Sequence, residues 1–229
     1  MKTIQLNLLK VLGLSALIGV SSIGIAHAQD GAFSQILTHL MSAWPWYLTR
    51  ASGFVAAFCL LLLMLSGIGF ITGHTFLFLE PLMGWATHRS LGIALTVSLL
   101  IHMFVLLFDH FNSFSLDNLL VPFNSTYKTL TIDYVSFGSL YLAFGIIAFY
   151  TIIIVMMTSV SWMDEKPTAW RLVHFLSYAT MFLVFLHGLF LGTDLQDGAL
   201  RWIWIVSGAI LFGALVARVW RAGTLGRGR

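Results

Sequence analysis

Four histidines lie in pairs inside apolar stretches of the sequence. His88 and His102 stand 14 positions apart in one stretch, and His174 and His187 stand 13 positions apart in another. An ionisable side chain inside a membrane is costly, and by default it indicates a functional site. Two imidazoles that face each other from neighbouring helices are the ligands of an axially coordinated haem iron. The two pairs therefore predict haem coordination between two helices.

The composition places these histidines in a membrane protein. Of 229 residues, 59% are apolar and only 9% are charged, whereas a soluble domain carries about 25% charged residues. This contrast excludes a soluble globular enzyme, a disordered chain and a nucleic-acid binder. Cys59 is the only cysteine, so a disulfide framework and a thiolate metal site are excluded as well. Any chemistry must use histidines, carboxylates or a bound cofactor.

Five apolar stretches follow the N-terminal region, and each is long enough for a tilted helix that spans a membrane. Continuously apolar runs of this length satisfy their backbone hydrogen bonds in lipid as helices. The predicted fold class is all-α, a polytopic membrane helix bundle. Its five spans are expected at about residues 47–71, 85–111, 134–160, 170–192 and 201–219.

Residues 1–28 have the layout of a secretory signal peptide. They begin with lysines, continue with an apolar centre and end on Ala26-His27-Ala28, which resembles a cleavage site. The alternative is an uncleaved first span, which would give six spans. Residues 29–45 are expected to form an external N-terminal segment, residues 46–220 the membrane domain and residues 221–229 a basic cytoplasmic tail.

The basic residues predict the orientation of the spans. With Gln29 outside the cytoplasm, most of them fall on the inner side, as the positive-inside rule requires; they are Arg89, Lys166, Arg171, Arg218, Arg221, Arg227 and Arg229. We therefore expect a multi-pass protein of the bacterial inner membrane with a cytoplasmic C-terminus. The second and fourth spans then run parallel, so the histidines pair at an inner and an outer level about 20 Å apart. The inner pair is His88 with His174, and the outer pair is His102 with His187.

The helical phase of the second pair needs an explanation. On an ideal helix, a spacing of 14 residues puts His102 within about 40° of the face that carries His88. A spacing of 13 residues puts His187 about 140° away from the face that carries His174. The fourth span must therefore contain a local distortion, or the two haems must be rotated relative to each other. Other roles for the histidines stay open: a zinc site, which needs three or four ligands, a proton relay, or hydrogen bonds between helices.

Three arginines are candidate partners for haem propionates. Arg89 and Arg171 each lie within three residues of an inner histidine, and Arg50 lies at the outer end of the first span. The competing interpretations are positive-inside anchoring for the first two and snorkelling for Arg50. Gly92 and Gly188 stand close to histidines in the sequence and could let a flat macrocycle approach the backbone, although glycine is common in membrane helices.

At several landmarks the sequence resembles the ferric reductase-like transmembrane domain family. The resemblance covers about residues 44–219 and is most specific at the two histidine pairs. It also includes residues 46–53 (WYLTRASG), 88–92 (HRSLG), 120–123 (LVPF), 186–188 (LHG) and 192–194 (GTD). The family includes the membrane domains of ferric reductases and NADPH oxidases, and the haem subunit of a periplasmic methionine sulfoxide reductase system. The resemblance implies that His88, His102, His174 and His187 are axial ligands of two b-type haems.

The expected function is electron transfer across the membrane. The sequence lacks the flavin- and NADPH-binding domain of eukaryotic members, and it has no G-x-G-x-x-G strand–helix unit. A cytoplasmic flavoprotein reductase or membrane quinol would then supply electrons, and external ferric iron, oxygen or a periplasmic redox protein would accept them. The alternatives are a cytochrome b anchor that exchanges electrons with quinone, and a haem-free carrier or scaffold. A carrier would more often place carboxylates inside its spans.

Overall fold

The structure is a computed structural model that describes residues 30–72, 81–109, 114–127, 131–132, 135–136 and 139–226. The expected signal peptide, residues 1–28, lies outside the described residues, as do residues 227–229 of the tail. The chain divides into two compact units, Met1–Trp44 and Pro45–Arg229. All the candidate site residues belong to the second unit.

The first described helix is α2, Asp30–Thr72, which contains Pro45. The two units divide at this residue. Proline lacks the N–H that would bond to the carbonyl four residues earlier, so it interrupts the helical hydrogen-bond ladder. Of the expected external N-terminal segment, residues 29–45, the part from Asp30 onward is helical, and its place outside the membrane stays a prediction.

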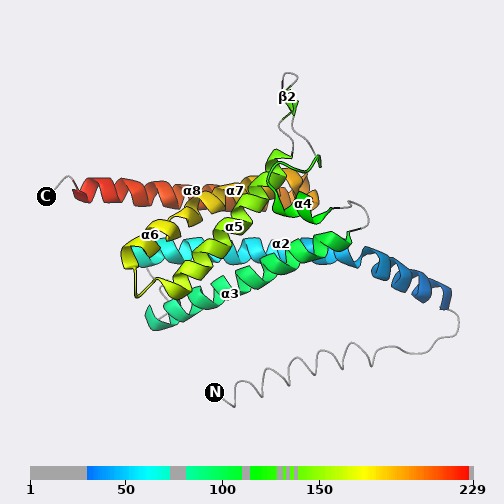
Figure 1. The fold of residues 1–229 in the computed structure, drawn as a ribbon, viewed down its shortest axis with the longest axis horizontal. Helices are drawn as coiled ribbons and strands as arrows, with labels where there is room; N and C mark the ends of the chain where they lie inside the picture. Colours follow the sequence, from blue (N-terminus) through cyan, green and yellow to red (C-terminus); the bar gives the residue numbers. More distant parts are fainter. Residues whose placement is uncertain are drawn as a thin grey trace, which may run out of the picture. The chain divides into compact units, whose positions relative to one another are not determined.

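Helices form nearly all of the remaining described chain, and the exceptions are short. A small antiparallel hairpin pairs two strands of two residues each, β1 (Thr131–Ile132) and β2 (Val135–Ser136). Figure 1 shows the second unit as a bundle of long helices with α4 and this hairpin at one end. In chain order the helices after α2 are α3 (Pro81–Val105), η1 (Leu106–Phe108), α4 (Leu116–Leu120), α5 (Leu140–Ser161), α6 (Pro167–His174), α7 (Leu176–Leu191), η2 (Thr193–Leu195) and α8 (Gly198–Gly226).

Five helical segments are long and apolar enough to cross a membrane. They are Phe33–Gly69, Gly84–Phe108, Leu140–Ser161, Pro167–Leu191 and Gly198–Trp220. Many large apolar side chains on them are exposed, among them Val160 and Trp220, as expected for surfaces that face lipid. The prediction of an all-helical, multi-pass membrane protein is confirmed. The third span begins at Leu140, not near residue 134 as expected, because Val135 and Ser136 pair with Ile132 and Thr131 as strands.

The buried core lies where α2, α3, α5 and α8 meet. Around it pack half-buried apolar side chains, which include Tyr178 and Met181 of α7. Ala143 and Ala148 of α5 are almost fully buried, and small side chains let helix backbones approach closely in membranes. The core cluster consists of Ala56, Cys59, Leu60, Met64, Leu95, Ile152 and Leu211.

Candidate functional site: two histidine pairs between the second and fourth spans

The structure brings the four histidines together as two pairs: His88 of α3 faces His174 of α6, and His102 of α3 faces His187 of α7. The ring centroids of His88 and His174 are 6.4 Å apart, with 45° between the ring planes. Those of His102 and His187 are 6.5 Å apart, with 82° between the planes. Two imidazoles bonded to one metal ion from opposite sides, through nitrogen–metal bonds of about 2.0–2.1 Å, have centroids about 6.3 Å apart. The spacing at both levels therefore fits axial coordination.

The number of histidines at each level also fits the binding of a haem iron by two histidines. Within the described parts of the chain, no three side chains of His, Cys, Asp or Glu gather closely enough to hold a metal ion. The histidines instead meet two at a time, which is the number that bis-histidine haem coordination uses. A zinc site would use three or four ligands.

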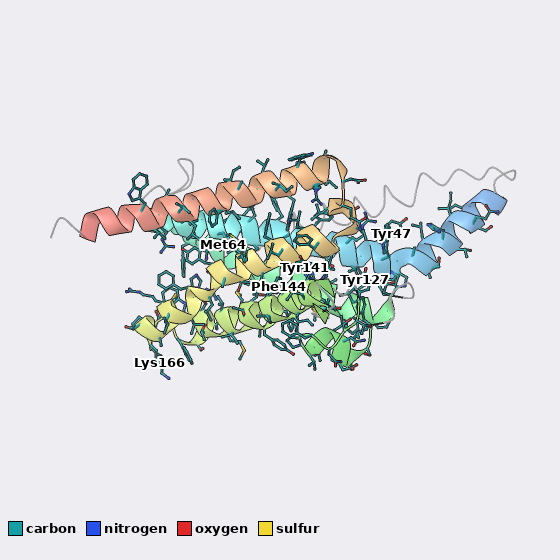
Figure 2. All side chains as sticks on the ribbon, turned by 90° about the horizontal axis from the view of Figure 1, so that it is seen from above. Tyr47, Met64, Tyr127, Tyr141, Phe144 and Lys166 are labelled. Atoms are coloured by element: carbon teal, nitrogen blue, oxygen red, sulfur yellow. The ribbon has the colours of Figure 1, made fainter. Side chains whose placement is uncertain are left out.

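At the outer level, backbone carbonyls hold both rings. Nδ1–H of His102 donates to the carbonyl oxygen of Thr49 at 2.9 Å, and Nδ1–H of His187 donates to that of Tyr141 at 2.8 Å. A carbonyl can only accept, so Nδ1 carries the proton and Nε2 keeps the lone pair that bonds a metal. Metal-binding histidines ordinarily have such a second partner. Figure 2 shows Tyr141 on α5 beside α7.

At the inner level, serine hydroxyls take the place of the carbonyls. Ser66 Oγ lies 2.7 Å from Nδ1 of His88 and donates its own proton to the carbonyl of Leu63 at 2.9 Å. Ser159 Oγ lies 3.4 Å from Nδ1 of His174 and accepts a hydrogen bond from Trp170 at 3.1 Å. The same two helices, α2 and α5, thus support the histidines at both levels.

Two glycines other than Gly92 and Gly188 let these helices approach the outer histidines. A Cβ atom on Gly53 of α2 would lie 3.1 Å from Nδ1 of His102, and one on Gly145 of α5 would lie 2.5 Å from Nδ1 of His187. Gly92 and Gly188, the two candidates from the sequence, instead pack against Met156 and Trp204. The close approach therefore occurs on the supporting helices, opposite the histidines.

A cavity of about 240 Å³ contains the outer pair. Its walls come from α2, α3, α5 and α7, and Phe114, Leu119 and Tyr127 of the segment around α4 also line it. The Oγ1 atom of Thr49 is buried in this wall without a hydrogen-bond partner among the described residues. A mostly apolar cavity with a paired ligand set and an unsatisfied polar atom fits a haem.

Two polar side chains from beyond the apolar part of the second span also line this cavity. Asp109 is buried there, and Tyr127 lies in the same wall. Burial, together with the nearby charge of Asp109, raises the pKa of Tyr127. The phenol therefore remains protonated at neutral pH and can donate a hydrogen bond.

The three candidate arginines have different environments. Arg50 of α2 forms an ion pair with Asp194 of η2, its Nε atom lies 2.5 Å from Asp194 Oδ2, and its guanidinium stacks 3.8 Å from the Trp46 ring centroid. Arg50 also lines the outer cavity. Arg89 and Arg171 are exposed on the helices that carry His88 and His174. A propionate contact stays a prediction for all three.

The helix of the fourth span is interrupted between its two histidines. Helix α6 ends at His174, a turn follows at Phe175, and α7 begins at Leu176. The N–H of Tyr178 bonds to the carbonyl of Phe175, three residues back, at 3.2 Å. A break in the helix, one of the two explanations that the 13-residue spacing allows, thus lies between His174 and His187.

Comparison with known proteins identifies no relative. No family model, no curated protein and no solved structure matches the chain. The resemblance to the ferric reductase-like family stays a prediction from the sequence, and the functional argument depends on the geometry of the two histidine pairs.

Proposed function

We propose that this chain is a ferric reductase-like transmembrane cytochrome b that binds two b-type haems and carries electrons between the two faces of a membrane. The observation that carries the proposal is the pairing of His88 with His174 and of His102 with His187, at centroid distances of 6.4 and 6.5 Å that fit two ligands of one metal ion. Haem, when bound, supplies an iron that alternates between the ferric and ferrous states.

The protein's residues hold the two sites in place and keep them apart. His88 and His174 bind the inner iron, and His102 and His187 bind the outer iron, each through Nε2. The core cluster separates the levels: Leu95 lies between the two histidines of α3 in sequence, and Leu60 lies between Gly53 and Ser66 of α2. Apolar side chains there exclude water from the path between the sites.

The direction and the partners follow from the proposed topology. A cleaved signal peptide and a cytoplasmic C-terminus in the bacterial inner membrane put His88 and His174 on the cytoplasmic side. A flavoprotein reductase or membrane quinol then delivers electrons there, and external ferric iron, oxygen or a periplasmic redox protein accepts them. Arg89 and Arg171 at the inner level and Arg50 at the outer level bind propionates.

A second candidate function is a membrane anchor that exchanges electrons with quinone. The observation that favours it is an apolar cavity of about 480 Å³ between α2, α7 and α8. Phe54, Leu60 and Trp204 line both this cavity and the outer histidine cavity. An apolar quinone bound there would lie next to the outer haem.

A haem count tests the proposal. The purified protein should contain two haems per chain by pyridine haemochrome assay, and its dithionite-reduced minus oxidised spectrum should be that of a low-spin cytochrome b. The control is His39→Ala, since His39 is exposed on the first unit and should be dispensable for both haems. A colourless protein would refute the electron-transfer function and favour a haem-free carrier or scaffold.

A further inference from the structure

Helix α2 meets the two histidines of α3 with different chemical groups. At the outer level it offers the backbone carbonyl of Thr49, and at the inner level the side-chain hydroxyl of Ser66. A backbone carbonyl is the same in every residue, whereas a hydroxyl depends on one side chain. The inner contact is therefore the one that a single substitution on α2 can remove.

Ser66 has one acceptor and one histidine within hydrogen-bond distance. When its hydroxyl donates to the carbonyl of Leu63 at 2.9 Å, a lone pair of Oγ accepts from Nδ1–H of His88 at 2.7 Å. The side chain is buried, with 7% exposure, so bulk water contributes little to this contact. His88 is thus held in the tautomer that leaves Nε2 as the metal-binding nitrogen.

Hydrogen bonding at Nδ1 also changes what the imidazole does to a metal ion. An acceptor at Nδ1–H raises the basicity of the ring and its donation to the metal. Stronger donation stabilises ferric relative to ferrous iron and lowers the reduction potential of the haem, and hydrogen bonding around the axial ligand is one of the protein's means of tuning it.

We infer that Ser66 is a positioning residue that sets the reduction potential of the inner haem through its hydrogen bond to His88. The inference rests on the proposed function, because it requires haem at the inner level. It goes beyond that function by assigning control of one site to a residue that would not touch the iron.

Ser52 provides a matched control on the same helix. It lies 14 residues before Ser66, is equally buried at 6% exposure, and likewise donates its hydroxyl proton to a carbonyl of its own helix, that of Leu48 at 2.7 Å. Its hydroxyl also lies 3.1 Å from the carbonyl oxygen of Thr49, which belongs to the outer level, and it does not contact His88. Ser52→Ala therefore reproduces the loss of a buried serine hydroxyl from α2 without the loss of the contact to His88.

The experiment is a potentiometric titration of the full-length haem-loaded protein and its Ser66→Ala, Ser66→Thr and Ser52→Ala variants. The inner haem is the spectral component that His88→Ala removes. We expect Ser66→Ala to keep both haems, to move the inner midpoint to a more positive potential and to leave the outer midpoint unchanged. Ser66→Thr, which keeps the hydroxyl, and Ser52→Ala should both have the wild-type inner midpoint.

Each other outcome has a defined meaning. An unchanged inner midpoint in Ser66→Ala, or an equal shift in Ser52→Ala, would overturn the inference. Ser66→Ala could also lose the inner haem altogether. In that case the inference is supported if Ser66→Thr keeps the inner haem at the wild-type midpoint, and it is overturned if Ser66→Thr loses the inner haem as well. Absence of haem from the wild-type protein is a different result, because it refutes the proposed function itself.

Discussion

Each outer histidine uses its two ring nitrogens for different tasks. Nδ1 of His102 and of His187 is occupied by a backbone carbonyl of a neighbouring helix, and this bond fixes the ring plane before any metal binds. Nε2 of each ring is left with the lone pair that can bond a metal. A site organised in this way is sensitive to small displacements of the supporting helix, because the carbonyl and the ring must stay within hydrogen-bond distance.

Gly145→Ala should show this sensitivity. The new Cβ would lie 2.5 Å from Nδ1 and 2.6 Å from Cε1 of His187, so the ring or α5 must move and the bond to Tyr141 must lengthen. We expect the affinity for the outer haem to fall by about 10–100-fold, as when the partner of a metal-binding histidine is lost, while the inner haem remains. The control is Gly213→Ala on α8, where no atom lies within 4 Å of the added Cβ. Equal haem content in both variants would contradict the prediction.

At the scale of the helices, the sequence predicts well what depends on periodicity and poorly what depends on local contacts. The pairing of His88 with His174 follows from parallel spans and a rise per residue that is the same in all α-helices. The need for a distortion in the fourth span follows from the same geometry, but its position does not, because Phe175 is neither proline nor glycine. Ser66, Gly53 and Gly145 could not be selected either, because their roles arise only when helices pack.

The packing of α5 gives an element-scale prediction. Ala143 has 0% exposure, so Ala143→Leu has no space for its added carbons and should cost about 1–3 kcal/mol of stability through overpacking. Thermal unfolding followed by the loss of the haem spectrum should show a lower midpoint than in the wild type. Ala179→Leu on α7, where the alanine is exposed, should leave the midpoint unchanged. A midpoint lowered equally in both variants would mean that burial on α5 is not the cause.

Across the whole molecule, the two histidine levels lie toward opposite ends of the bundle. The loop that contains Lys166 and the first turns of α3 are at the end of the inner pair, and η2 with Asp194 is at the end of the outer pair. Figure 2 shows Lys166 and Tyr127 at opposite ends. The direction of electron flow in a cell is therefore a question of which end faces the cytoplasm.

Cysteine labelling can determine which end of the bundle faces the cytoplasm. Cys59 is buried, so the wild-type protein gives little background with a maleimide that does not cross membranes. Lys166 and Gln196 are both exposed and lie on opposite sides of the span Pro167–Leu191. Because basic residues favour the cytoplasmic side, we expect Gln196→Cys to react in intact spheroplasts and Lys166→Cys to react only after lysis. The opposite pattern would place the outer pair, His102 and His187, on the cytoplasmic side and reverse the proposed electron path.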